Sequence, residues 1–307
     1  MSYSVKSIRK QFHDRGIFYT NTALAEYMKS FLPKDVDAVY DPACGHGNLL
    51  AIFGDDVEKY GQDINDEAVE AASRIPNSKI ICGDTLKDPA FLDRKFQAII
   101  ANPPFSIKWE PKEDERFADC GILPPRSKAD YAFILHCLHY LADDGIACVM
   151  CFPGVCYRGQ REGKIRRWLI EQNVIDAVVD IAGGEFEDTN IATVLLILRK
   201  DREKKDSIHF LDKKTGKERD VTIAEISNND FSLSLTTYID LQPPPEPVDI
   251  DEVNQDVCEH LLHMVRTELQ LEAMIYHIFH GPDYHDTIRE IRGILDEIER
   301  EDNLLPS

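Results

Sequence analysis

Short apolar runs alternate with helical patterns between residues 38 and 200. We expect strands at Ala38–Tyr40, Lys59–Asp63, Lys79–Cys82, Phe96–Ala101, 145–152, 174–181 and 193–198. We expect helices at 66–74, 131–141 and 164–172, the first capped by Asn65 or Asp66. Strands that alternate with helices predict an α/β fold, in which helices cover both faces of a mostly parallel sheet.

The pattern changes after residue 200. Ser207–Ile226 is typical of a hairpin that turns at Lys214-Thr215-Gly216, and Pro243–Pro247 reads as a stiff linker. Two amphipathic helices should follow, at 252–280 and 285–301, separated by Gly281-Pro282. We therefore divide the chain into a catalytic domain, 1–240, and an acidic helical appendage, 241–307, which packs on the core or binds another chain.

Charge and cysteine usage narrow the class of protein. The net charge is −20, and residues 241–307 carry 16 acidic and 4 basic side chains. Such a chain should not bind a phosphate backbone tightly by itself.

No apolar run reaches the ~18 residues of a membrane span, and no signal peptide is present, so we expect a cytoplasmic protein. Cys148 and Cys151 should face opposite sides of a strand, which argues against a metal or redox pair.

Acidic and glycine residues gather where the predicted strands end. Asp41-Pro-Ala-Cys-Gly-His-Gly47 follows the first strand, Asp63 ends the second and Asp84 follows the third. Ligands of parallel α/β sheets bind beyond the carboxyl ends of the strands, and an acid there can accept both ribose hydroxyls of a nucleoside cofactor. Asp84 could accept from an adenine amino group. The alternative is a tight turn and acids that cap helices.

Asn102-Pro103-Pro104-Phe105 follows the fourth strand and carries the sharper chemical signal. The exocyclic amine of adenine is a poor nucleophile because its lone pair is delocalised into the ring. An amide oxygen and a backbone carbonyl, from Asn102 and Pro103, can accept its protons and free the lone pair for attack on a methyl-sulfonium. Phe105 offers a stacking face for a base turned out of its duplex. An ordinary Pro-Pro turn is the structural alternative.

Two further groups of side chains have open interpretations. Arg158, Arg161, Lys164, Arg166 and Arg167 form either a solvated helix face or a set of phosphate contacts beside the flipped base. His260/His263 and His277/His280 are spaced by three residues, but no HExxH pattern accompanies them. We expect no metal site.

These motifs together resemble the catalytic core of the modification subunit of type I restriction-modification systems, which are N6-adenine DNA methyltransferases. The resemblance covers about residues 15–240 and lies in Gly16–Thr20, Asp41–Gly47, Gly61–Asn65, Gly83–Thr85, Asn102–Phe105, Ala129–Ile134, Arg158–Arg166 and Asn190–Leu198. It implies a Rossmann-like methyltransferase fold. It departs from the family pattern at Asn21, where the family has Pro, and at His46 and Asn48, where it has Thr and Gly.

The resemblance also implies the residues of the site. The catalytic set is Asn102, Pro103, Pro104 and Phe105. The set for S-adenosylmethionine is Phe18, Tyr19, Thr20, Asp41, Ala43, Cys44, Gly45, Gly47, Asp63, Ile64, Asp84, Thr85 and Asn102. Arg158, Arg161, Lys164 and Arg166 are the candidates for DNA contact.

The sequence thus predicts transfer of a methyl group from S-adenosylmethionine to N6 of adenine in DNA by the catalytic subunit of a larger complex. No segment after the core looks able to read a major groove, so a separate specificity subunit should do so, and a nuclease subunit is a second candidate partner. A stand-alone adenine methyltransferase, a protein glutamine or RNA guanine methyltransferase, and an inactive scaffold are the alternatives. Phe18–Thr20 and the 158–166 segment argue against the glutamine and guanine enzymes, and intact Asn102 and Asp63 argue against the scaffold.

Overall fold

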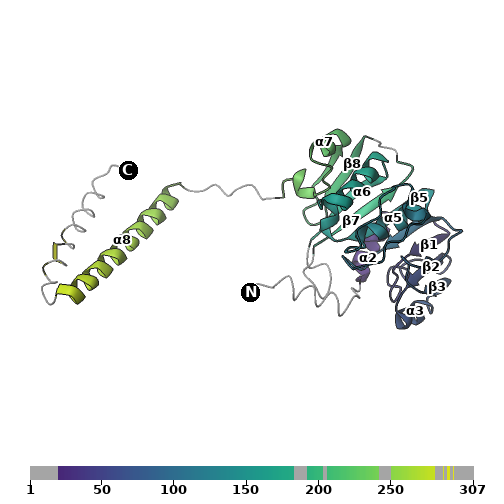
Figure 1. Ribbon diagram of the computed structural model, residues 1–307, viewed down its shortest axis with the longest axis horizontal. Helices are drawn as coiled ribbons and strands as arrows, with labels where there is room; N and C mark the ends of the chain where they lie inside the picture. The colour runs from purple at the N-terminus through teal and green to yellow at the C-terminus, as the bar shows by residue number, and fades with distance from the viewer. Residues whose placement is uncertain are drawn as a thin grey trace. The chain divides into compact units, whose positions relative to one another are not determined.

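The chain forms two units, Met1–Leu241 and Gln242–Ser307 (Figure 1). The computed structural model describes residues 20–182, 192–202, 206–241 and 250–280, together with Asp286, Arg289, Glu290 and Gly293. Within these residues, no helix is both long enough and apolar enough to cross a membrane.

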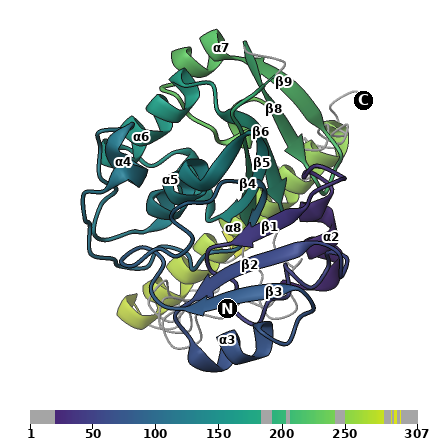
Figure 2. The ribbon, with the colours of Figure 1, turned by 90° about the vertical axis from the view of Figure 1, so that its right-hand side faces the viewer.

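A nine-stranded sheet is the frame of the first unit. Its strands, in chain order, are β1 (Ala38–Asp41), β2 (Glu58–Asp63), β3 (Ser78–Cys82), β4 (Phe96–Ala101), β5 (Leu141–Cys151), β6 (Ile175–Ile181), β7 (Thr193–Arg199), β8 (Ser207–Asp212) and β9 (Glu218–Thr222). Across the sheet the order is β3-β2-β1-β4-β5-β7-β6-β8-β9 (Figure 2). β7 runs antiparallel to both of its neighbours, and β9 is antiparallel to β8. The other pairs are parallel, so the predicted mostly parallel α/β sheet is confirmed.

Helices cover both faces of this sheet. They are α2 (Thr22–Lys29), α3 (Asp66–Ala72), α4 (Glu115–Ala118), α5 (Asp130–Tyr140), α6 (Gln160–Glu171) and α7 (Ile223–Asn228), with short 3-10 turns η1 (Pro153–Cys156) and η2 (Leu235–Thr237). One core cluster holds the buried faces of α5 and α6, and the other holds those of α2 and α3. Alternate residues of β5 divide between the two clusters, Cys151 in the first and Cys148 in the second, as predicted for a central strand.

The register brings the predicted ligand-facing ends of three strands together. Asp41 at the end of β1 pairs with Gly61, and Asp63 at the end of β2 pairs with Cys82 at the end of β3. β4 lies on the other side of β1, so Asn102, directly after β4, shares this edge. The carboxyl edge of the sheet therefore carries the glycine loop, both acidic strand ends and Asn102–Phe105.

Several elements differ from the sequence-based expectation; α4 was not expected, and β5 begins at Leu141 rather than at residue 145. α2 was not expected; Asn21 begins it by accepting a hydrogen bond from the backbone N–H of Leu24 at 2.8 Å. α6 begins at Gln160, before the expected Lys164, because Gly163 is accommodated inside the helix. The hairpin ends at Thr222 rather than Ile226, since the Thr222 hydroxyl accepts from the N–H of Glu225 and begins α7.

The second unit contains the long helix α8 (Ile250–His280), close to the predicted 252–280 helix. Large apolar side chains are exposed along it at Val257, Leu261, Met264, Leu271 and Ile275. The linker at Pro243–Pro247 and the break at Gly281-Pro282 lie outside the described residues, as does most of the predicted helix 285–301.

Candidate active site

The loop after β1 is held by backbone hydrogen bonds and two glycines with positive φ. The N–H of Cys44 donates to the carbonyl of Gln62 at 3.1 Å, and the N–H of Gly47 donates to the carbonyl of Cys44 at 2.8 Å. Gly45 and Gly47 have φ values of +51° and +84°, which disfavour any residue with a side chain. A Cβ on Gly47 would lie 2.3 Å from the Ile75 side chain, whereas Gly45 faces open space. The loop therefore packs on one side and leaves its backbone accessible on the other.

Asp63 connects this loop to the end of β2. One carboxylate oxygen accepts from the N–H of Gly45 at 2.8 Å, and the other accepts from the N–H of Asn65 at 2.9 Å. Each oxygen keeps a further lone pair, so the carboxylate can still accept hydrogen bonds from a ligand. The next residue, Ile64, is 72% exposed, an unusual position for a large aliphatic side chain beside a buried strand. Asp63 and Ile64 offer an acceptor and an apolar surface side by side.

Asp41 has a different role from that of Asp63. Its carboxyl group is buried and accepts a hydrogen bond from the N–H of Ala43 at 3.0 Å. Burial and, to a smaller extent, the negative charge of Asp63 raise the pKa of Asp41 to about 8, against the lowering effect of the hydrogen bond from Ala43. Asp41 therefore helps to hold the loop after β1 in place through its hydrogen bond with Ala43.

Asp84 and Thr85 form the third part of this edge. The Asp84 carboxylate is exposed and accepts from the N–H of Leu86 at 2.9 Å, so it caps the turn after β3. The Thr85 hydroxyl is buried and donates to the carbonyl of Pro42 at 2.5 Å, which links this turn to the glycine loop.

Sequence analysis missed the group that holds this third turn in place. The buried guanidinium of Arg116 donates to the carbonyls of Thr85, at 2.9 Å, and Leu86, at 2.7 Å. It also pairs with Asp114 and contacts His136, whose pKa burial holds well below the ordinary value. Arg116 lies in a charged, irregular segment that matches no motif, so only the fold places it here.

Asn102 lies half-buried at the carboxyl end of β4. Its amide nitrogen donates to the hydroxyl oxygen of Thr20 at 3.2 Å, which brings together two motifs that the sequence places far apart. Phe18 and Tyr19 lie outside the described residues. Thr20 is buried, so the nitrogen of the amide faces the protein interior.

The rest of the Asn102–Phe105 segment is anchored in the core. Pro103 is buried, Pro104 is half-buried, and Phe105 is half-buried against the core cluster that contains α2. The next residue, Ser106, has φ +53°. The segment is therefore a fixed loop, and part of the Phe105 ring remains exposed.

The basic segment at 158–167 is not a uniform solvated face. Arg166 is 4% exposed and donates to the backbone carbonyls of Val155, Arg158 and Phe231. Arg158 is mostly buried and paired with carboxylates, and Arg167 pairs with Glu171. Arg161 and Lys164 are exposed on α6. Of the four candidates for DNA contact, Arg166 makes its hydrogen bonds inside the protein.

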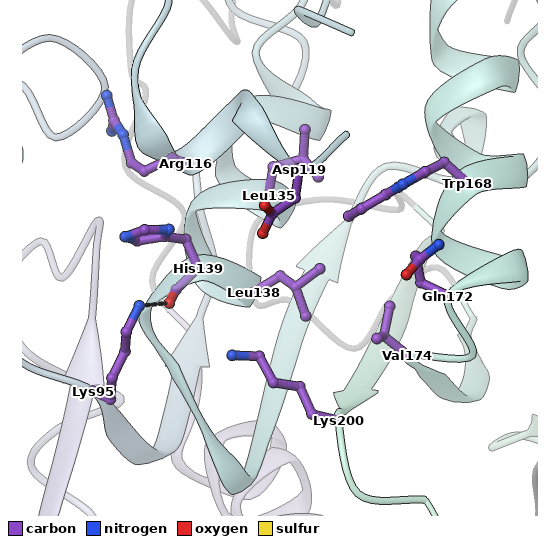
Figure 3. A pocket seen from close by; sticks show the side chains of 10 residues that line it. All are labelled: Lys95, Arg116, Asp119, Leu135, Leu138, His139, Trp168, Gln172, Val174 and Lys200. Carbon is purple, nitrogen blue, oxygen red and sulfur yellow. Dashed lines mark hydrogen bonds between the residues drawn. The ribbon is translucent and has the colours of Figure 1, made fainter. Parts of the chain in front are cut away.

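A separate hollow of about 550 Å³ lies away from this edge (Figure 3). It is lined by Lys95, Arg116, Asp119, Leu135, Leu138, His139, Trp168, Gln172, Val174 and Lys200. Lys95 directly precedes β4, Val174 precedes β6, and Lys200 follows the antiparallel β7, so the hollow lies towards the amino edge of the sheet. None of the predicted site residues lines it.

Within the described residues, no group of three or more His, Cys, Asp or Glu side chains could hold a metal ion. All eight cysteines have free thiols; Cys148 and Cys151 are buried, and burial raises the pKa of both. His260 and His263 are exposed on α8.

The chain matches a known family and several curated proteins. Residues 5–240 match the model of the N-6 DNA Methylase family. The type I restriction enzyme MpnII methylase subunit of Mycoplasma pneumoniae is 37% identical over 230 residues, which cover 64% of this chain and 42% of that protein. The chain spans about half the length of the curated relatives it matches.

Solved structures show the same fold. The type I restriction-modification methyltransferase subunit from Streptococcus thermophilus superposes with a TM-score of 0.66 at 29% identity, covering 73% of this chain and 59% of that one. A putative class I S-adenosylmethionine-dependent methyltransferase from Listeria monocytogenes shares the fold with a TM-score of 0.50 at 18% identity, covering 67% and 71%. With a family match that spans most of its length and an Asn-Pro-Pro-Phe loop beside a glycine loop, the chain belongs to the N-6 DNA methylase family.

Proposed function

We propose that this chain transfers a methyl group from S-adenosylmethionine to N6 of adenine in DNA, as the modification subunit of a type I restriction-modification complex. The observation that carries the proposal is the contact between Asn102 and Thr20. In this orientation the amide nitrogen faces the Thr20 hydroxyl, and the amide oxygen is the acceptor that remains for a substrate amine.

The residues at the carboxyl edge fit S-adenosylmethionine as the cofactor. Gly45 faces open space, Asp63 keeps free lone pairs, and Ile64 presents an exposed aliphatic surface suited to an adenine ring. The cofactor supplies a methyl group on a sulfonium sulfur. In the proposed arrangement, Asp63 accepts the ribose hydroxyls and the Gly45–Gly47 backbone lies against the nucleoside.

The chain's own groups activate the target amine. The Asn102 side-chain oxygen and the Pro103 backbone carbonyl each accept one proton of the adenine amino group, which localises the nitrogen lone pair for attack. As the nitrogen–methyl bond forms, the methyl–sulfur bond would break and leave a neutral thioether on the cofactor, and one of the two amino protons would then pass from the nitrogen to water. Phe105 stacks on the extruded base, a contact worth roughly 1–3 kcal/mol.

DNA contact on this chain falls to Arg161 and Lys164, the exposed residues among the four candidates; Arg167 is exposed as well but pairs with Glu171. A chain with net charge −20 needs more than these two groups to hold a duplex, so we assign most of the grip and all sequence reading to a specificity subunit. The exposed apolar positions Val257, Leu261, Met264, Leu271 and Ile275 make α8 the candidate surface for that subunit.

Methyl incorporation tests the proposal. The full chain is co-expressed with a candidate specificity subunit from a neighbouring reading frame, and radiolabelled S-adenosylmethionine is supplied with unmethylated DNA. We expect N6-methyladenine in DNA from the complex, and little from the chain alone. Label in protein glutamine or RNA guanine would favour the alternatives, and site-specific methylation by the chain alone would contradict the subunit assignment. Deletion of residues 248–307 should prevent co-purification with the specificity subunit while sparing cofactor binding.

A further inference from the structure

The residue that follows the Asn102–Phe105 loop is held by two side chains from other segments. Ser106 has φ +53°, a conformation that residues with a Cβ seldom adopt without support from their surroundings. Its N–H donates to one carboxylate oxygen of Asp130 at 3.2 Å, and its hydroxyl accepts from Arg158 at 3.1 Å. Support for the loop therefore comes from side chains outside it.

Arg158 lies at the centre of this arrangement. Its guanidinium is 3.6 Å from the second oxygen of Asp130 and donates to Glu162 at 3.2 Å. Asp130 and Glu162 are 5% and 7% exposed, and the Arg158 side chain is 15% exposed above the ring of Phe152. The Asp130 oxygen nearest Arg158 has no hydrogen-bond partner, so the ion pair with Arg158 compensates the cost of burying this oxygen.

The four groups come from separate parts of the fold. Ser106 follows β4, Asp130 is the first residue of α5, Arg158 follows β5 and η1, and Glu162 lies in the first turn of α6. A planar guanidinium with several donors can contact a hydroxyl and two carboxylates at once, whereas an ammonium is a point charge. Arg158 thus fixes the loop to the starts of two helices.

We propose that Arg158 and Asp130 are positioning residues for methyl transfer, which hold the Asn102–Phe105 loop in its reactive geometry through Ser106, and that Arg158 does not contact DNA phosphates. The inference rests on the proposed function for its link to catalysis. Small displacements of a catalytic group are costly, since a shift of about 1 Å can lower a rate a hundredfold.

Hydrogen–deuterium exchange tests the tether without reference to activity. In the full chain, Ser106→Ala and Arg158→Lys should each raise backbone exchange at residues 105–108 about threefold or more, while exchange in β9 stays unchanged. Unaltered exchange at 105–108 in both variants would overturn the tether, whether or not the protein is a methyltransferase.

Single-turnover methyl transfer by the complex then tests the link to catalysis, with Arg161→Gln as the matched comparison on the same segment. Arg158→Lys should lower the transfer rate about tenfold or more, with DNA affinity and S-adenosylmethionine affinity within about twofold of wild type. Arg161→Gln should lower DNA affinity instead. Loss of DNA affinity in Arg158→Lys with an unchanged rate would make Arg158 a phosphate contact and overturn the proposal. A wild-type complex that transfers no methyl group would refute the proposed function, and the exchange measurement would still decide the tether.

Discussion

The Asn102 amide nitrogen donates to the Thr20 hydroxyl oxygen at 3.2 Å, across 82 residues of sequence. A freely rotating amide would present its NH₂ group and its oxygen to a substrate amine with similar frequency, and two NH₂ groups cannot pair. In the observed orientation the nitrogen faces the Thr20 hydroxyl, and the oxygen is the end left available to a substrate amine. A segment expected to bind the cofactor therefore also contacts the amide that we propose to be catalytic.

Replacement of Thr20 by Val should lower single-turnover methyl transfer about tenfold, equivalent to ~1.4 kcal/mol in the barrier, because the amide loses its acceptor. Thr20→Ser keeps the hydroxyl and should retain most of the rate. If Thr20→Val alters only the affinity for S-adenosylmethionine, measured by calorimetry, the residue contacts the cofactor and does not orient Asn102.

Asn102→Ala should abolish methyl transfer and leave S-adenosylmethionine binding largely intact. The amide oxygen is proposed to act on the attacking amine, so its loss belongs to the chemical step. Single-turnover rates measured with the complex, beside calorimetry of cofactor binding, separate the two effects. A rate that drops less than tenfold would show that Asn102 does not have this role.

Asp63→Ala should weaken S-adenosylmethionine binding by ~2 kcal/mol, because two ribose hydroxyls lose a charged acceptor and the Gly45 N–H loses its partner. Glu70→Ala is the matched control, since Glu70 is an exposed acid on α3 that pairs with Arg74. Calorimetry should show unchanged affinity for the control. Equal affinities for both variants would remove Asp63 from the cofactor site.

Asp41→Asn should change how stability depends on pH. The pKa of Asp41 rises from 3.8 to about 8 on burial, so the folded state keeps a proton between these values that the unfolded chain releases. The free energy of unfolding of the wild type therefore falls as the pH rises through this window, by at most about 1.4 kcal/mol per pH unit. This fall is absent in Asp41→Asn, which has no proton to release.

Chemical denaturation of the full chain at pH 5 and pH 8 measures this effect. The stability of Asp41→Asn relative to wild type should increase between the two values, and the increase should level off above about pH 8. Asparagine keeps the side-chain oxygen that accepts from the Ala43 N–H, so the comparison isolates the charge. A pH-independent difference would mean that Asp41 titrates as it does in the unfolded chain.

Much of this fold follows from local pattern. Sequence periodicity reports local features. These include the buried strands of β-branched and aliphatic residues and the glycine loop after the first of them. The hairpin at β8 and β9 was expected, but its parallel pairing with β6, which extends the sheet, depends on long-range contacts. α2 has an Asn at its cap and a short apolar face, which is too little signal to distinguish it from a loop.

The limits of prediction from sequence are clearest for the basic residues at 158–166. Arg158, Arg161 and Arg166 are alike in charge, yet one holds a loop, one faces solvent, and one is buried against backbone carbonyls. Which of them faces solvent depends on what lies beside η1 and α6, including Asp130 and Phe231 from distant segments. A sequence pattern gives the charge of such residues and not their partners.

One outer strand of the sheet restricts how this protein can associate. β9 ends its side of the sheet with exposed Glu218, Arg219 and Asp220. Charged side chains along an open edge discourage another chain from adding a strand by backbone pairing. β3, at the opposite side, carries Lys79 but also exposed Ile81 and Cys82, so its sequence gives no such protection. A partner on the β9 side must therefore be recognised by side-chain contacts.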